Sequence, residues 1–484
     1  MYGVRIVSYL TPENRFVNRM KHIHMIGVGG SGMSGIAEVL HNLGFVVSGS
    51  DIQKSRITKR LAAMGIKVMI GHDAKNIKQA NVVVISSAIK ATNPELSAAK
   101  EQHKTILSRA EMLAELMRFK IGIAVAGTHG KTTTTSLIAS VLAAGQLDPT
   151  FVIGGLLNSA GTNAGLGTSE YLVAEADESD GSFQLLQPIL AVVTNIDADH
   201  MQTFDGKFSL LKQAFNNFLH HLPFYGVAVL CTDNEPVAEL AEELLRPVIT
   251  YGLSEKAMVR AISIKHHKQN MSFNVVRDNK TLAKNIIINL PGLHNVQNAL
   301  AAIAIALELG IDIEQIKKGL STFAGIGRRF NLTRKLSCQD GTFTLVDDYA
   351  HHPTELTAAI SACRGGWNNR LVVVFQPHRY SRTRDLFDEF TESLNQADVL
   401  VLTDVYAAGE EPLSGFSSGD LSRSIRSRGK IDPIYIADVN NLLTDLSTIV
   451  KHGDLLLMAG AGSIGSICQL IVDNKGLTAE VSRD

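Results

Sequence analysis

Three glycine-rich turns, each following a short apolar run, constrain what this 484-residue chain can fold into. The turns are GVGGSG (27–32), GTHGKT (127–132) and GAGSIG (460–465). Continuously apolar runs of strand length are typical of parallel strands that are buried on both faces. Strands that alternate with helical stretches predict crossover connections. The chain is therefore predicted to be an α/β protein with mostly parallel sheets, and its length suggests about three domains.

Composition excludes several classes of protein. Lys and Arg number 46 against 47 Asp and Glu, so there is no overall basic field for nucleic acid. No apolar run approaches the roughly 20 residues that span a bilayer, and the first residues show no signal-peptide pattern. Four widely spaced cysteines without a CxxC pair predict reduced, buried thiols in a cytoplasmic protein.

The first turn matches GxGxxG, follows an apolar strand and precedes a helical stretch. Glycines let the backbone approach a pyrophosphate, and a helix N-terminus favours negative charge. Asp51 ends the next predicted strand, near the usual place of a ribose-binding acid. The pattern predicts a dinucleotide or nucleotide-diphosphate site without separating NAD from other ligands. The alternative is a tight turn without a ligand.

The second turn resembles a phosphate-binding loop. Its backbone amides would surround phosphates, Lys131 would supply the counter-charge, and the Thr132 hydroxyl would face Mg²⁺. It departs from GxxxxGK[ST] because Val125 stands where the first glycine is expected. The third turn repeats GxGxxG, but no acid follows in the expected place, and a packing turn is favoured over a phosphate site.

Acids and a histidine follow two apolar runs of the central part. EADESD supplies Glu175, Asp177, Glu178 and Asp180. Since ligands lie at the carboxyl ends of parallel strands, Glu175 is the first choice for a Mg²⁺ ligand and Glu178 the second. NIDADH places Asp199 and His200 after the next strand, where His200 would bind a second Mg²⁺ or a phosphate.

The last third of the chain offers further polar groups at predicted strand ends. DDYAHH includes Asp348, Tyr349 and His351, and PHRYSR includes His378, Arg379 and Arg382. The two arginines would clamp an anion, or else form surface salt bridges. Arg328 could face a transferring phosphate. In LHNVQN, His294, Asn295 and Asn298 would either cap a helix or contact a base or ribose.

Together these residues resemble the Mur ligase family. The resemblance rests on GTHGKTT, EADESD, NIDADH, GLHNVQNA, HPTE and QPHRYSR, which occur in the family's order over nearly the whole chain. The N-terminal IGVGGSGMSGIAEVL, with DDYAHHPTE and FQPHRYSR, looks like the branch that adds L-alanine to UDP-N-acetylmuramate. That resemblance implies a cytoplasmic, ATP-dependent amide-bond-forming ligase of peptidoglycan synthesis, and thereby a role in cell shape and cell division. It also implies ATP, two Mg²⁺ ions, small-molecule substrates and a monomer or homodimer.

The resemblance also implies three domains: a Rossmann-like domain for the UDP-sugar (1–118), a P-loop-type ATPase domain (119–325) and a Rossmann-like amino-acid domain (326–484). The implied UDP-sugar contacts are Gly27, Gly29, Gly30, Ser31, Gly32, Ser50, Asp51, His72, Ser86, Ser87 and Arg109. The implied ATP contacts are Gly127, Thr128, His129, Gly130, Lys131, Thr132, Thr133, His294, Asn295 and Asn298. Mg²⁺ would lie on Thr132, Glu175 and His200. The amino acid would meet Tyr349, His351, His378, Arg379 and Arg382. The catalytic residues would be Lys131, His200, Arg328, Asp348 and His351.

One departure and three alternatives accompany this prediction. Most relatives carry a carbamylated lysine shortly after the DH pair, whereas this chain has Phe215 near that place, as the alanine-adding branch does. The first alternative is a murein peptide ligase that attaches a tripeptide to the same sugar nucleotide. The second is an NAD-dependent oxidoreductase, which leaves GTHGKT unexplained. The third is a non-enzymatic, nucleotide-gated regulator.

Overall fold

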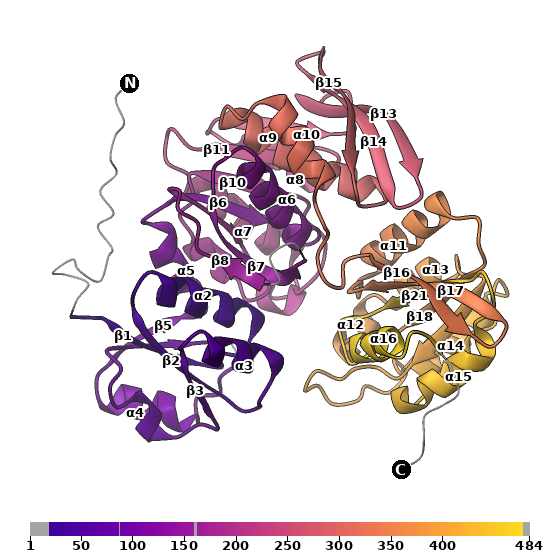
Figure 1. Cartoon of the computed structure of the whole chain (residues 1–484), viewed down its shortest axis with the longest axis horizontal. Helices are drawn as coiled ribbons and strands as arrows, with labels where there is room; N and C mark the ends of the chain where they lie inside the picture. Colours follow the sequence, from indigo (N-terminus) through magenta and orange to yellow (C-terminus); the bar gives the residue numbers. More distant parts are fainter. Residues whose placement is uncertain (1–18, 87, 159–161, 478–484) are drawn as a thin grey trace. The chain divides into compact units, whose positions relative to one another are not determined.

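The computed structural model describes residues 19–477 except 87 and 159–161. Its sheets have five, ten and six strands (Figure 1). The chain forms two compact units. The first lies within Met1–Ser263, Phe273–Ile286 and Gln297–Ala324, and the second within Ile264–Ser272, Ile287–Val296 and Gly325–Asp484. The predicted α/β class with mostly parallel sheets is confirmed.

The five-stranded sheet is parallel throughout, in the order β3-β2-β1-β4-β5. Its strands are β1 (His22–Ile26), β2 (Val46–Asp51), β3 (Lys67–Ile70), β4 (Val82–Ile85) and β5 (Thr105–Ser108). Its helices are α2 (Ser31–Asn42), α3 (Arg56–Ala63), the 3₁₀ turn η1 (Ala74–Ile77), α4 (Pro94–Glu101) and α5 (Arg109–Met117). From β1 to β3 successive strands are added toward one edge of the sheet, and β4 and β5 are added toward the other edge. The strand order therefore reverses between β1 and β4. Such a switch point is where open α/β sheets bind ligands.

Alternate side chains of these strands enter two different cores. Met25 and Val47 face the core that includes α2 and α5, while Ile26 and Val83 pack with Leu96 of α4. Burial of both faces explains why the strands read as continuous apolar runs.

The ten-stranded sheet has the order β15-β14-β13-β12-β11-β10-β6-β9-β7-β8. Its first strands are β6 (Ile121–Ala126), β7 (Thr150–Leu157), β8 (Thr162–Gly165), β9 (Tyr171–Glu175) and β10 (Leu190–Val193). The others are β11 (Val227–Cys231), β12 (Val248–Gly252), β13 (Val259–His267), β14 (Asn270–Arg277) and β15 (Lys280–Ile288). The helices are α6 (Lys131–Ala144), η2 (Ser182–Leu185), η3 (Met201–Phe204), α7 (Phe208–His220), α8 (Glu235–Glu243), α9 (Leu293–Glu308) and α10 (Ile313–Ser321).

The antiparallel segment predicted over 257–290 forms β13, β14 and β15. Two-residue connections join these strands, which only antiparallel neighbours allow. Asp278 and Asn279 both have positive φ, as a type I′ hairpin requires. The segment extends the central sheet through β12 and β13, which are parallel.

The six-stranded sheet has the order β16-β17-β21-β18-β19-β20, and only its β16–β17 pair is antiparallel. Its strands are β16 (Asn331–Cys338), β17 (Gly341–Asp348), β18 (Leu371–Phe375), β19 (Val399–Thr403), β20 (Ile434–Ile436) and β21 (Leu455–Ala459). The helices are α11 (Pro353–Gly366), α12 (Tyr380–Asp385), α13 (Phe387–Leu394), α14 (Ser418–Ser427), η4 (Val439–Asn441), α15 (Leu442–Ile449) and α16 (Ile464–Asp473). Val372 and Val373 enter opposite cores, so helices cover both faces.

Two predictions from composition can be compared with the structure. Within the described residues, no helix is both long enough and apolar enough to cross a membrane. The four cysteines are free and buried, as predicted. The predicted domain boundaries stay a prediction.

Candidate functional site

The first glycine turn connects β1 to α2 and is bound to the end of β2. Gly27 has φ +80°, which favours glycine. The amides of Gly27 and Val28 donate to the Ser50 carbonyl at 2.9 and 3.0 Å. The Gly29 amide donates to Asp51 Oδ2 at 2.8 Å. The turn therefore brings together the predicted residues Gly27, Gly29, Gly30, Ser31, Gly32, Ser50 and Asp51, with Ser31 as the first residue of α2.

Polar side chains from later strands approach this turn. A Cβ added to Gly32 would lie 2.9 Å from Arg109 Nη1, and one added to Gly27 would lie 3.1 Å from Ser86 Oγ. His72 Nδ1 lies 3.0 Å from Ser50 Oγ. Ser87, also predicted here, lies outside the described residues. An arginine beside a helix N-terminus at a switch point provides the positive field that a diphosphate needs.

The second glycine turn connects β6 to α6 and is held by the residues after β10. Gly127 has φ +133° and Gly130 has φ +83°. The Thr194 hydroxyl donates to the His129 carbonyl at 2.6 Å. The Asn195 side chain accepts from the His129 amide at 2.8 Å and donates to its carbonyl at 3.0 Å. The backbone is thus preformed as a loop at the N-terminus of a 14-residue helix.

Lys131 is the first residue of α6, and its half-buried side chain reaches back to this loop. It donates to the Gly127 carbonyl at 2.7 Å and to both Glu178 oxygens at 2.9 and 2.7 Å. Burial alone would lower the pKa of Lys131, but Glu178, Asp177 and Glu175 together outweigh burial and raise that pKa. Burial raises the pKa of Glu178 to about 7. Lys131, which is predicted to bind phosphate, is therefore paired with the buried acid Glu178.

Two other acids of EADESD also lie near Lys131. The Glu175 carboxylate accepts from the Gly154 amide at 2.8 Å, and Asp177 Oδ2 lies 3.5 Å from Arg109 Nη2. Both acids, like Glu178, act to raise the pKa of Lys131. Three acids therefore lie near one lysine and one arginine.

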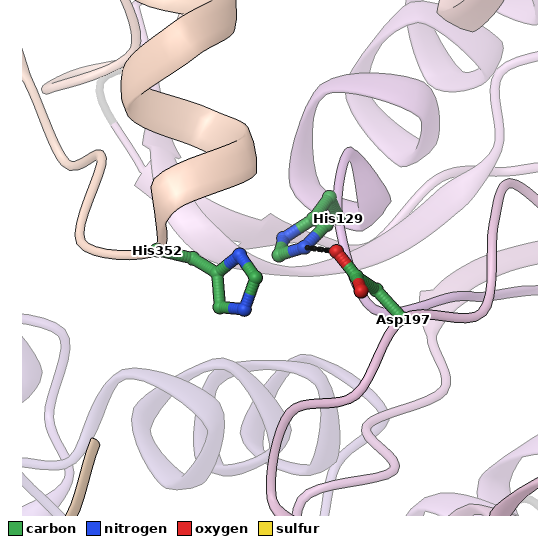
Figure 2. A group of neighbouring side chains, drawn as sticks. All are labelled: His129, Asp197 and His352. Atoms are coloured by element: carbon green, nitrogen blue, oxygen red, sulfur yellow. Dashed lines mark hydrogen bonds and ion pairs between the residues drawn. The ribbon is translucent and has the colours of Figure 1, made fainter. Parts of the chain in front are cut away.

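The segment after β10 supplies the remaining predicted groups. His129 Nε2 lies 3.1 Å from Asp197 Oδ2 (Figure 2), and the Thr128 hydroxyl accepts from the Asp197 amide at 2.9 Å. His352, also drawn in Figure 2, belongs to the second unit, where its ring accepts from the Thr354 amide at the start of α11. His200 has φ +55°, and its Nε2 lies 3.5 Å from Asp199 Oδ2.

The predicted Mg²⁺ ligands come from the carboxyl ends of three neighbouring strands, in the order β10-β6-β9. His200 follows β10, Thr132 lies in the first turn of the helix after β6, and Glu175 ends β9. The Thr132 hydroxyl and the Glu175 carboxylate are oxygen donors of the kind that Mg²⁺ prefers, and the acids around Lys131 suit a cation. His200 offers a ring nitrogen instead, so the donor chemistry fits the metal at two of the three residues. Glu178, the second choice, is bound to Lys131 instead.

Thr132 and Thr133, both predicted to contact ATP, lie in the first turn of α6 and are buried. The Asn298 side chain accepts from the Thr134 hydroxyl at 3.1 Å, and a Cβ on Gly130 would lie 2.7 Å from Asn298 Oδ1. Asn298 therefore supports the loop from α9.

His294 and Asn295 belong to the second unit. Burial lowers the pKa of His294 to about 4, so the ring is neutral at pH 7. The Asn295 amide donates to the Pro291 carbonyl at 2.7 Å, which ties down the start of α9. The two alternatives for Asn295, capping the helix or contacting a base or ribose, stay predictions.

Arg328 is fixed by groups of the second unit. Its Nη2 donates to the Gly460 carbonyl at 2.5 Å, its Nε lies 3.5 Å from Asp347, and its guanidinium lies 5.0 Å from the centre of the Tyr349 ring. It has φ +60°. A non-glycine residue in this conformation is over-determined by its surroundings, which matches a side chain held in one orientation.

The predicted amino-acid residues form one cluster at the ends of β17 and β18. The rings of Tyr349 and His351 are 5.3 Å apart, and those of His351 and His378 are 5.9 Å apart. His378 also stacks on Tyr406 at 5.5 Å. Burial, together with the charges of His351 and two arginines, lowers the pKa of His378 to about 4. The cluster therefore consists mainly of aromatic rings, and the His378 ring within it is uncharged at pH 7.

Asp348 and the two arginines add charge to this cluster. The Asp348 carboxylate accepts from the Phe330 and Ala350 amides at 2.8 and 2.7 Å, and burial raises its pKa to about 6. Arg382 is buried, and its Nη1 lies 3.3 Å from His378 Nδ1. Arg379 is exposed with φ +69°.

The third glycine turn, after β21, is explained by packing. A Cβ on Gly460 would lie 2.9 Å from the Gln376 carbonyl, one on Gly462 would lie 2.6 Å from Tyr406, and one on Gly465 would meet the Arg328 guanidinium. Gln376 Oε1 accepts from the Ile464 amide at 3.1 Å. The glycines make room for side chains of this domain, and the choice between a packing turn and a phosphate site stays a prediction.

Sequence reasoning missed three supporting residues. Glu95 lies under Ser50 and His72, Asn195 holds the phosphate loop, and Glu355 accepts from the His351 amide at 2.9 Å. Asn195 lies within a segment already singled out, and Glu355 within HPTE. Glu95 has no such signal, because its partners, from Asn76 to His24, lie far from it in the sequence.

Comparison with known proteins covers most of the chain. Residues 22–121 match the Mur ligase family catalytic domain, 125–306 the Mur ligase middle domain, and 328–462 the Mur ligase glutamate ligase domain. A UDP-N-acetylmuramate–alanine ligase from Thermotoga maritima is 27% identical, with a TM-score of 0.79 over 93% of this chain and 98% of that one. A murein peptide ligase from Psychrobacter arcticus 273-4 is 24% identical, with a TM-score of 0.68 over 95% and 100%. The UDP-N-acetylmuramate:L-alanyl-γ-D-glutamyl-meso-diaminopimelate ligase from Neisseria meningitides is 32% identical, with a TM-score of 0.58 over 64% and 100%.

Proposed function

Because this chain belongs to the Mur ligase family, we propose that it joins L-alanine to the carboxylate of UDP-N-acetylmuramate and converts ATP to ADP and phosphate. The observation that carries an ATP-dependent reaction is Lys131, half-buried in a preformed glycine loop, with three acids from the end of β9 around it. An NAD-dependent oxidoreductase would leave this arrangement unexplained. Its place in peptidoglycan synthesis, in the cytoplasm and in cell shape and division follows from the same proposal.

One observation in the structure favours alanine over a preformed peptide. Phe215, near the place of the family's carbamylated lysine, is fully buried and packs 5.0 Å from Phe183. A core aromatic there supports the branch that dispenses with that lysine.

The first step would be attack of the sugar carboxylate on the γ-phosphate of ATP, which gives an acyl phosphate and ADP. Both reactants are anions, so their repulsion must be offset. Lys131 would exchange Glu178 for phosphate oxygens, and Arg328, fixed by the Gly460 carbonyl, would hold the transferred group. Mg²⁺ on Thr132, Glu175 and His200 would supply additional positive charge.

The second step would be attack of the amine of alanine on the acyl phosphate, which releases phosphate and forms the amide. The amine must be neutral to attack, so a base is required. Asp348, with a pKa of about 6, is ionised at pH 7 and is our first choice, with His351 the second. Arg379 and Arg382 would bind the carboxylate of alanine and orient the amine. Because nucleotide and amino acid are assigned to different domains, the reaction requires domain closure.

The test is phosphate release from ATP with UDP-N-acetylmuramate and one acceptor at a time. We expect release with L-alanine and none without an acceptor. L-Serine, glycine and the tripeptide L-Ala-γ-D-Glu-meso-diaminopimelate serve as competing acceptors. Release with the tripeptide but not with alanine would assign the chain to the murein peptide ligases. Release without any acceptor would argue for a nucleotide-gated regulator, and binding of NAD would argue for the oxidoreductase.

A further inference from the structure

A buried polar network lies on the α4 face of the five-stranded sheet, otherwise an apolar core. Its centre is Glu95, whose side chain is fully buried. Glu95 Oε2 accepts from the Ser50 hydroxyl at 2.5 Å and lies 3.2 Å from His72 Nδ1. Glu95 Oε1 accepts from the Asn76 amide at 2.5 Å. One carboxylate thus joins β2, the loop after β3 and α4.

Helix α4 fixes the position of this carboxylate. Asn93 Oδ1 accepts from the Glu95 and Leu96 amides at 2.9 and 3.2 Å and so caps the helix. Pro94 occupies its first position. Glu95 is therefore held in the first turn, where the helix dipole favours a negative charge.

His24 completes the network from the middle of β1. It is fully buried, its Nδ1 lies 2.9 Å from Ser48 Oγ, and its Nε2 lies 3.6 Å from Glu95 Oε2. Burial by itself would raise the pKa of Glu95, but His24, Ser50 and Asn76 outweigh burial and lower it to about 2. Glu95 is therefore a carboxylate at neutral pH.

A carboxylate at this position fixes the hydrogens of its neighbours. It can only accept, so the Ser50 hydroxyl must donate to it and His72 must carry a proton on Nδ1. The Nε2 atom then remains for a ligand. A buried acid that selects a tautomer in this way acts like the carboxylate partners of metal-binding histidines.

The network is directly connected to the first glycine turn. The carbonyl of Ser50, whose hydroxyl meets Glu95, accepts from the amides of Gly27 and Val28. The next residue, Asp51, accepts from the Gly29 amide. Any shift of Ser50 is thereby transmitted to the backbone that would surround the diphosphate.

We propose that Glu95 is a positioning residue for the sugar nucleotide, which it serves by orienting Ser50 and His72 rather than by touching the ligand. This inference rests on the proposed function, in which the glycine turn holds UDP-N-acetylmuramate. It predicts that the negative charge of Glu95, and not merely its volume, sets affinity for the UDP part.

The test is titration calorimetry of the full-length protein with UDP-N-acetylmuramate and with UDP, comparing the wild type with Glu95→Gln. We expect the Kd of the variant to rise about tenfold. In steady state, KM for the sugar nucleotide should rise while KM for ATP is unchanged. Asn93→Ala is the matched control, because it removes the cap of the same helix turn and leaves the carboxylate in place. We expect it to lower the unfolding midpoint without raising the Kd.

A second comparison tests the route of the effect. If Glu95 acts through His72, then Glu95→Gln should raise the Kd much less in a His72→Ala background than in the wild type. Equal factors in both backgrounds would overturn the proposal, as would a rise in Asn93→Ala equal to that in Glu95→Gln. If the wild type binds the nucleotides and Glu95→Gln binds them with the same Kd, the role of Glu95 is refuted, whereas the proposed substrate is not. Failure of the wild type to bind either nucleotide refutes the proposed substrate and this role with it.

Discussion

Replacement of Glu95 by Gln should weaken the five-stranded sheet in a manner that depends on pH. The variant keeps the side-chain shape but removes the charge that Ser50, His72 and Asn76 surround. The carboxyl has a pKa of about 2 in the folded protein against an ordinary value of 4.5. Each pKa unit is worth about 1.36 kcal/mol. The charge therefore stabilises the fold by about 3 kcal/mol at pH 7, to order of magnitude.

The direction of the pH dependence follows from the lowered pKa. A carboxyl that is more acidic when folded contributes its full stability above the unfolded pKa and loses it as the pH falls toward the folded pKa. For Glu95 the contribution is complete above about pH 5.5, falls to less than half of its full value at about pH 3 and to a small fraction of it at about pH 2. The gap between wild type and Glu95→Gln should shrink accordingly.

The assay must report on this sheet alone, since a chain with several domains need not unfold in one step. Hydrogen exchange measured on peptides from β1, β2 and β4 does so, because local opening free energies are read directly from exchange rates. Wild type and variant are compared at the same pH, so the intrinsic exchange rates cancel. Peptides from β17 to β21 serve as the internal control. A gap of equal size at pH 7 and pH 3 would show that the charge of Glu95 is not what stabilises the sheet.

Four further predictions concern the proposed reaction. Lys131→Ala should abolish phosphate release, measured with UDP-N-acetylmuramate and alanine, while UDP binding by calorimetry is retained; near-normal release would refute the phosphate-loop assignment. In the wild type, kcat/KM for alanine should fall as the pH drops through about 6, where Asp348 takes up a proton. The Asp348→Asn variant should have a low kcat/KM that no longer changes with pH in this range. Arg379→Ala should raise KM for alanine at least tenfold with a smaller change in kcat, and an unchanged KM would remove this arginine from the clamp. Gly130→Ala should cost about 1–2 kcal/mol through its positive φ and also weaken ATP binding, whereas Gly310→Ala, with φ +72° and no heavy atom within 4 Å of the added Cβ, should cost stability only.

The sheets and the ends of their strands could be predicted from the sequence, because residues close together in the chain specify each of them. A run such as IGIAVA followed by GTHGKT specifies a buried strand, a tight turn and a helix start within a dozen residues. Ends of parallel strands share one edge of a sheet, so Glu175 and His200 could be assigned to the side of Lys131 before any contact was known. Their assigned roles stay predictions.

The supporting contacts were not accessible, because they join residues far apart in sequence. Glu95 reads as an ordinary acid in the first turn of a surface helix, and only the packing of α4 on β1 and β2 reveals it as a buried carboxylate. Likewise, nothing in EADESD distinguishes a metal ligand from a partner of Lys131. The bidentate contact of Glu178 follows from the close approach of the β9 end to the phosphate loop.

Two turns with the same GxGxxG spacing illustrate why a motif needs its surroundings. At 27–32 the glycine backbone donates to Ser50 and Asp51, the turn opens the 12-residue helix α2, and Arg109 lies beside it. At both turns the missing side chains make room for protein groups: a Cβ on Gly29 would meet the Asp51 carboxylate, and one on Gly465 would meet the Arg328 guanidinium. That guanidinium in turn binds the Gly460 carbonyl. The third turn therefore contributes to the proposed chemistry indirectly, because its glycines allow Arg328 the one orientation in which the surrounding backbone holds it.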